Sequence, residues 1–134
     1  VVQAVLIGIA SISILVGAIG ILNAMFTSVL ERTKDIGIMK SIGAKNSDIL
    51  IIFLIESGAI GLTGGLIGAI LGLGMAYLVQ GLAATVGIEL LKVQFNLSIF
   101  IFSLVFAFFV GVISGIVPAY RASKLKPVDA LRYE

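Results

Sequence analysis

The sequence predicts an all-α membrane protein with three transmembrane helices, a short amphipathic helix in the first connection and a short helix at the C-terminus. The composition is the first observation: the 134 residues are 60% hydrophobic and only 12% charged, and mean hydropathy is +1.22. A soluble domain of this size could not bury so much apolar surface. Second, three apolar runs are each long enough to cross a bilayer. Third, the chain has 16 glycines, which suit closely packed membrane helices.

The first expected span covers residues 4–30. At 1.5 Å per residue it is ~40 Å long, more than the ~30 Å hydrocarbon core, so it should project beyond the membrane. Gly17 and Gly20 belong to a row of small residues on which another helix could pack. The Asn23 amide would be costly facing lipid, so we expect it to hydrogen-bond to another helix or to a backbone carbonyl rather than to a substrate.

The second expected span covers residues 57–79, and its helix begins with the polar triplet 46–48, which is typical of a helix start. Glu56 divides this long run. A carboxylate is expensive at the bilayer centre, so we place it at the interface, where we expect it to pair with Arg32 or Lys34. Glycines recur through this span at intervals that predict close helix packing, among them Gly61, Gly65, Gly68 and Gly72.

The third expected span covers residues 97–117 and carries a small-residue row that includes Gly111 and Gly115. A short outer connection, residues 80–96, precedes it. Pro118 is expected to end or kink the helix, because proline removes a backbone hydrogen bond. In the tail, residues 118–134, Pro127 suits the first turn of a short final helix.

The distribution of basic residues predicts the orientation. Four Lys and Arg residues lie in residues 31–48, one lies in residues 80–96, and four follow Pro118. Basic loops are typically cytoplasmic, so the first connection and the C-terminus are expected in the cytoplasm and Val1 outside. The protein is thus expected to be a multi-pass protein of the cytoplasmic membrane. We expect a further span upstream of Val1, with some extracytoplasmic structure between the two.

Residue types exclude most chemistry from this chain. It has no cysteine and no histidine, which removes thiol nucleophiles and the commonest metal ligand. Gly43-Ala44-Lys45-Asn46 lacks the spacing and the Gly-Lys pair of a nucleotide-binding P-loop. We therefore expect no catalytic, cofactor or metal site, and no nucleic acid as a partner.

The connection at residues 31–48 carries the strongest functional signal. On a helical wheel Ile38, Met39 and Ile42 cover one face, Ile36 extends it, and Lys40 lies on the opposite side. Gly43 is a natural stop for this helix. This pattern predicts a short helix roughly parallel to the membrane, with its apolar face toward lipid headgroups or a protein groove. A connection that only turned the chain could be much shorter, which favours the groove.

Two groups of residues form recognisable motifs. The first is Asn23-x-Met25-x-x-Ser28-Val29-x-Glu31-Arg32-x-x-Asp35-Ile36-Gly37-Ile38, followed by Ile42-Gly43-Ala44 and Phe53-Leu54-Ile55-Glu56. The second is Pro118-Ala119-x-x-Ala122-Ser123-x-Leu125-x-Pro127-Val128-Asp129-Ala130-Leu131-Arg132-Tyr133-Glu134. Together they resemble the FtsX-like permease family of ABC transporters, in particular its MacB and LolC/LolE types. Asp35 stands where that family more often has Glu, which keeps the charge. The resemblance covers nearly the whole chain, from the second to the fourth span of a four-span permease.

The resemblance implies a permease that forms a homo- or heterodimer and works with a separate or fused ATPase, which would bind the ATP and Mg. It further implies mechanotransmission, in which ATP-driven closure of the ATPases moves the outer domain. The first connection would then be the coupling helix, its apolar residues packing in the ATPase groove and its charged residues fixing the register. The expected coupling residues are Glu31, Arg32, Lys34, Asp35, Ile36, Ile38, Met39, Lys40, Ile42 and Gly43.

Two other kinds of function fit the same sequence. A secondary transporter fragment would require Asn23 or Glu56 for ion-coupled uptake and would need no ATPase. A membrane scaffold would relay a signal to a cell-wall hydrolase without transporting anything. The resemblance would place substrate recognition in the outer domain.

Overall fold

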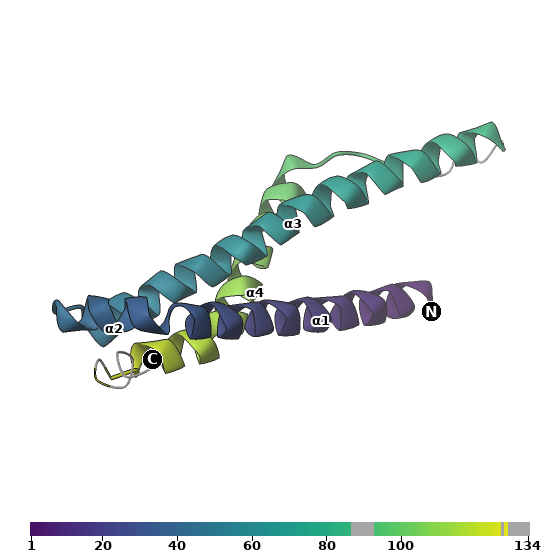
Figure 1. Cartoon of the computed structure of the whole chain (residues 1–134). Coiled ribbons are helices and arrows are strands. Elements are labelled where there is room, and N and C mark those ends of the chain that lie inside the picture. Colours follow the sequence, from purple (N-terminus) through teal and green to yellow (C-terminus); the bar gives the residue numbers. More distant parts are fainter. Residues whose placement is uncertain (87–92, 127, 129–134) are drawn as a thin grey trace.

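The computed structural model describes residues 1–86, 93–126 and 128. This part of the chain contains four α-helices and no strand: α1 (Val2–Glu31), α2 (Thr33–Ser41), α3 (Asn46–Thr85) and α4 (Leu97–Ser123) (Figure 1). By length and composition α1, α3 and α4 could each cross a membrane. The predicted all-α class with three candidate spans and a short helix in the first connection is therefore confirmed. The expected final helix lies outside the described residues.

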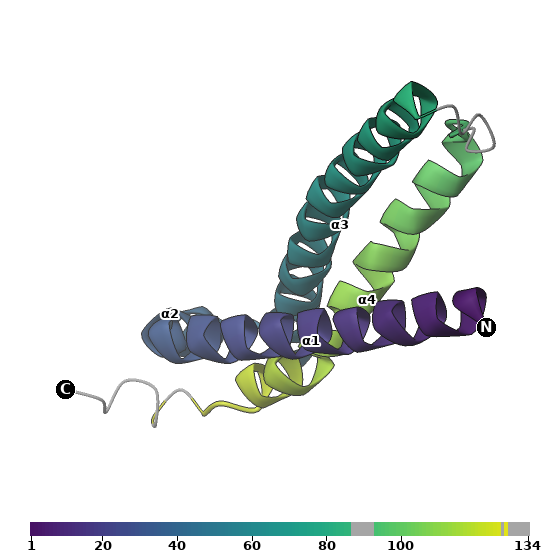
Figure 2. The same cartoon turned by 90° about the vertical axis from the view of Figure 1, so that its right-hand side faces the viewer.

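The four helices meet at one end of the molecule. Helices α3 and α4 run side by side in opposite directions, and α1 crosses them at a steep angle (Figure 2). The C-terminal end of α1, all of α2, the start of α3 and the end of α4 gather at the same place (Figures 1 and 2). From there α1 and α3 diverge, so the two long helices are far apart at their opposite ends.

A small apolar core occupies this meeting point. Ile36 of α2 is 0% exposed, and each of the three long helices adds two buried side chains around it. We call this core the junction cluster; its members are Met25, Val29, Ile36, Ile49, Phe53, Ala119 and Ala122. Most large apolar side chains elsewhere on the long helices are exposed on this chain. That is expected of helices whose solvent is lipid, because lipid tails are as apolar as a protein core.

A direct backbone contact joins α3 to α4. The Cα atoms of Gly61 and Gly111 face each other, so that a Cβ added at Gly111 would lie 3.0 Å from the Gly61 Cα atom and would overlap the Ser57 carbonyl oxygen. Only residues without side chains permit helix backbones to approach so closely. The predicted glycine row of α4 thus lies in a helix interface.

Two helix ends differ from the sequence-based expectation. Helix α3 continues to Thr85, beyond the expected start of the outer connection at residue 80. Helix α4 passes through Pro118 and ends only at Ser123, so Pro118 does not end it. Pro118, Ala119 and Ala122 are all buried at the meeting point, and this packing compensates the hydrogen bond that proline cannot donate.

Candidate functional site

Helix α2 continues almost directly from α1. Arg32 is the one residue between them, with φ −99° and ψ 13°, and its backbone N–H still donates to the Ser28 carbonyl at 3.0 Å. The Thr33 hydroxyl donates to the Val29 carbonyl at 2.9 Å. These bonds satisfy carbonyls that the end of α1 would otherwise leave unpaired. The direction of α2 is therefore coupled to the end of α1.

The other end of α2 is closed by a Schellman motif. Gly43 has φ +107°, in the region that favours glycine. The Gly43 N–H donates to the Lys40 carbonyl at 3.1 Å, and the Ala44 N–H donates to the Met39 carbonyl at 3.0 Å. Ala44 and Met39 both pack against the junction cluster. Gly43 thus lies at the helix stop that the sequence predicts.

The apolar side chains of α2 divide between the inside and the outside of the chain. Ile36 is 0% exposed, so it packs in the junction cluster and is not available on an outer face, which corrects the expectation that it extends that face. Met39 is half-buried against the same cluster. Ile38 and Ile42 are 45% and 81% exposed. These two residues are four positions apart and form the outward apolar surface of α2, hereafter the Ile38/Ile42 face.

An ion pair links the start of α2 to α3. The Arg32 guanidinium Nη1 lies 3.2 Å from the Glu56 Oε2 atom, so the pairing predicted for Glu56 is confirmed with Arg32 as its partner. The two side chains are 53% and 28% exposed. An exposed pair of this kind contributes at most ~1 kcal/mol to the stability of the fold. Its main effect is therefore to orient the start of α2 relative to α3.

Lys40 links the far end of α2 to the end of α4. Its ammonium donates to the carbonyl oxygens of Ser123 and of Leu125, the latter at 2.7 Å. Burial and the neighbouring Lys124 ammonium lower the pKa of Lys40. The sequence prediction placed Lys40 among the residues that meet the ATPase and missed this contact. No local pattern could have revealed it, because its acceptors lie more than eighty residues away.

The remaining charged residues of the expected coupling set face outward. Glu31, Lys34 and Asp35 are all exposed. Asp35 lies in the first turn of α2, where a carboxylate complements the positive end of the helix. The surface around the Ile38/Ile42 face therefore carries charges of both signs.

The predicted packing residues fall into two groups. Gly61, Gly65, Gly111 and Gly115 lie where an added Cβ would meet the neighbouring helix, so the structure brings them together in the α3–α4 contact. The others are open or exposed on this chain: an added Cβ would meet nothing at four of the glycines, and the Asn23 amide is exposed with no hydrogen-bond partner among the described residues. This second group is Gly17, Gly20, Asn23, Gly68 and Gly72.

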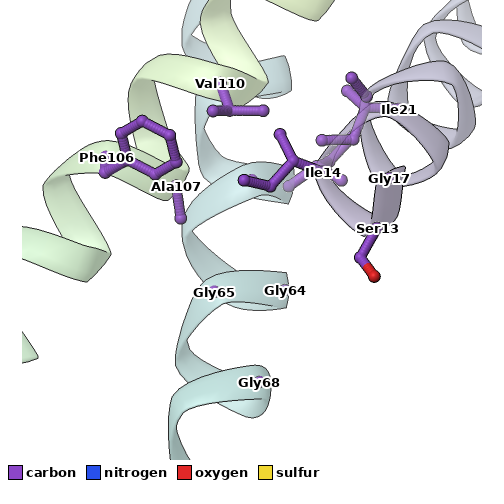
Figure 3. A pocket seen from close by; sticks show the side chains of 13 residues that line it. Ser13, Ile14, Gly17, Ile21, Gly64, Gly65, Gly68, Phe106, Ala107 and Val110 are labelled. Atoms are coloured by element: carbon purple, nitrogen blue, oxygen red, sulfur yellow. The ribbon is translucent and has the colours of Figure 1, made fainter. Parts of the chain in front are cut away.

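An apolar groove of about 570 Å³ separates α1 from the α3–α4 pair. Figure 3 shows Ile14 and Ile21 of α1 on one side, with Gly64 and Gly68 of α3 on the other and Ala107 of α4 beside them. Its walls carry few polar atoms, as expected where helices diverge within a membrane.

Comparison with known proteins decides which kind of membrane protein this is. The model of the FtsX-like permease C-terminal family matches residues 7–127. The chain belongs to this family. It is also similar to an uncharacterized ABC transporter permease of Methanocaldococcus jannaschii, at 47% identity over 96% of this chain and 32% of the relative. The ABC transporter permease YknZ of Bacillus subtilis is 46% identical, over 94% of this chain and 30% of the relative.

A third relative carries an ATP-binding part in the same protein. It is the macrolide export ATP-binding/permease protein MacB of Haemophilus ducreyi, 47% identical over 94% of this chain and 17% of its own length. The FtsX-like chain therefore spans less than a third of the length of these three relatives. It corresponds to a transmembrane permease part of an ABC transporter, and no group of residues that could hold a metal ion occurs within its described part.

Proposed function

We propose that α2 and its flanking residues are the coupling element through which this permease receives an ABC ATPase on the cytoplasmic side of the membrane. The observation that carries the proposal is the division of α2 into two faces. Ile36 anchors the helix in the junction cluster, while the Ile38/Ile42 face is left exposed. An exposed apolar pair on a short helix at the end of three long apolar helices is suited to a protein groove.

The way in which α2 is held supports a role in transmission. It is attached to α1 through Arg32, to α3 through the Arg32–Glu56 pair, and to α4 through Lys40. Because α2 is attached to all three long helices, we expect a push on the Ile38/Ile42 face to displace their ends rather than to bend a loose loop. This fits mechanotransmission, in which a dimer of permeases relays ATPase closure to an extracytoplasmic domain.

The relatives add the expected partner. The MacB relative of Haemophilus ducreyi is named as an ATP-binding/permease protein. The sequence of this chain, in contrast, carries no P-loop. We therefore expect the ATPase in a separate subunit or in another part of the same protein. We expect ATP hydrolysis by this partner to move an outer domain, for export, lipoprotein release or signalling.

The experiment is Ile38→Asp in the full-length permease, with the ATPase co-expressed. A carboxylate on the Ile38/Ile42 face would have to be desolvated in the groove, so ATPase binding is expected to weaken by about tenfold or more. Co-purification and stimulation of ATP hydrolysis are the two measurements. Membrane insertion and abundance should be unchanged, because Ile38 lies outside the junction cluster.

Ser41→Asp is the matched control, because it adds the same charge at another exposed position of α2. We expect it to retain the ATPase. Normal co-purification and stimulation with Ile38→Asp would show that the coupling assignment is wrong. If the wild-type permease itself associates with no ATPase, a scaffold or an ion-coupled transporter becomes the better explanation.

A further inference from the structure

The end of α4 is capped by a residue from a different helix. The last carbonyls of an α-helix have no partner within the helix, and together they carry the negative end of its dipole. In α4 two acceptors at this end, the carbonyls of Ser123 and Leu125, take hydrogen bonds from the Lys40 ammonium. A cation at this position is favourable because it can donate to the unpaired carbonyls and because it complements the negative end of the dipole. Here the cation is Lys40, which belongs to α2.

The residues on both sides of the Lys40 contact are packed in place. Ser123 is 3% exposed and Leu125 packs against the junction cluster, so both acceptors lie on chain that is itself held in place. Lys40 is half-buried and lies one turn after Ile36 on the same side of α2, which corrects the expectation that it lies opposite the apolar residues. Two donors of one ammonium meet two backbone acceptors, which restrains the distance and the direction of approach.

We propose that Lys40 is a positioning residue that fixes the orientation of α2 on the end of α4, so that displacement of the Ile38/Ile42 face reaches α4. This inference rests on the proposed function, which makes the Ile38/Ile42 face the docking surface. It assigns Lys40 to the inside of the permease rather than to the contact with the ATPase. Ile36 holds α2 in the junction cluster, and Lys40 determines how the helix is turned there.

The first measurement is local and needs no ATPase. Spin labels on cysteines introduced at Ser41 and Tyr120, both exposed, report the distance between α2 and α4 in the full-length permease. Lys40→Met keeps most of the stem but removes all three donors. Loss of charge-assisted hydrogen bonds lowers the population of the pinned arrangement by about tenfold or more, so the distance distribution should broaden and shift. Lys40→Arg, which keeps charge and donors, should restore a single narrow distance.

The second measurement concerns coupling. In Lys40→Met the affinity for the ATPase should stay within about threefold of wild type, because the Ile38/Ile42 face remains. Transport activity per ATP hydrolysed, or movement of the outer domain in response to ATP, should fall by about tenfold. Lys126→Met is the control, since it removes one exposed ammonium, one residue after Leu125 in the sequence, without removing the cap. It should behave as wild type in both measurements.

The outcomes separate this inference from the proposed function. An unchanged distance distribution and unchanged coupling in Lys40→Met would overturn the positioning role. Loss of ATPase binding in Lys40→Met equal to that in Ile38→Asp would also overturn it, because Lys40 would then be a contact residue. If Ile38→Asp binds the ATPase normally, the proposed function fails, and the distance measurement still decides whether Lys40 pins α2 to α4.

Discussion

Replacing Gly111 with alanine is expected to force α3 and α4 apart. The new Cβ would lie 3.0 Å from the Gly61 Cα atom and 3.1 Å from its nitrogen, whereas an ordinary contact at this position requires 3.4–4 Å. It would also overlap the Ser57 carbonyl oxygen. All three neighbours are backbone atoms, so no side-chain rotation relieves the overlap. The helices must separate by roughly 0.5 to 1 Å, and strain of this kind typically costs about 1–3 kcal/mol.

A matched glycine isolates that cost. Gly72 also lies in the interior of a long helix, α3, and a Cβ there would meet nothing within 4 Å. Both substitutions gain the same helix propensity, up to ~1 kcal/mol, so the difference between them is the steric cost alone. Thermal unfolding of the full-length permease in detergent, followed by the loss of soluble monodisperse protein, should give a lower Tm for Gly111→Ala than for wild type. Gly72→Ala should be equal to wild type or higher.

The reciprocal substitution tests the same contact from the other helix. Gly61→Ala should destabilise to a similar extent, because its Cβ would lie 2.9 Å from the Gly111 Cα atom. The double variant should cost less than the two single variants together, since the helices need to separate only once. If Gly111→Ala proves as stable as Gly72→Ala, α3 and α4 do not make the backbone contact described, and the reasoning from it is refuted.

Two smaller effects are expected near α2. Gly43→Ala should destabilise the permease by about 1–2 kcal/mol, because the φ of +107° at this position is unfavourable for a residue with a side chain. Gly64→Ala is the control and should not destabilise it, because a Cβ there would meet nothing within 4 Å. Unfolding measurements on both variants compare the two. Equal stability of the two would contradict the Schellman motif. A double-mutant cycle of Arg32→Gln and Glu56→Gln should give a coupling free energy below about 1 kcal/mol that falls further in high salt, because the pair is partly exposed. A coupling of several kcal/mol would mean that the pair is buried in the assembled transporter.

The sequence predicted the elements better than their contacts. Composition and hydropathy were sufficient for three long apolar helices, because the length of a span follows from bilayer thickness. A partner for Glu56 could be narrowed to Arg32 or Lys34 because a carboxylate within an apolar run needs a cation, and only the structure identifies Arg32. In contrast, Pro118 was expected to end or kink α4. Proline removes a backbone hydrogen bond, but α4 continues to Ser123, and the burial of Ala119 and Ala122 that offsets this loss lies beyond any local pattern.

In the candidate site, too, the helix could be predicted from the sequence but its contacts could not. The apolar pattern of α2 predicted a helix and the stop at Gly43, which depend on neighbouring residues. The pattern could not show which isoleucine is buried. Ile36 and Ile38 are the same type of residue on one short helix, and only the position of the long helices decides which of them packs inside. Glycine spacing also could not distinguish Gly61, which meets α4, from Gly68, which meets nothing. Both depend on the angle at which the helices cross.

The contact between Gly61 and Gly111 divides α3 into two unequal arms. At 1.5 Å per residue the arm toward Asn46 is roughly 23 Å long and the arm toward Thr85 is roughly 36 Å long. A rotation of α3 by about 5° around this contact would move the Asn46 end by about 2 Å and the Thr85 end by about 3 Å. The glycines would then serve as a fulcrum, and a small displacement beside α2 would be enlarged at the opposite end of the same helix.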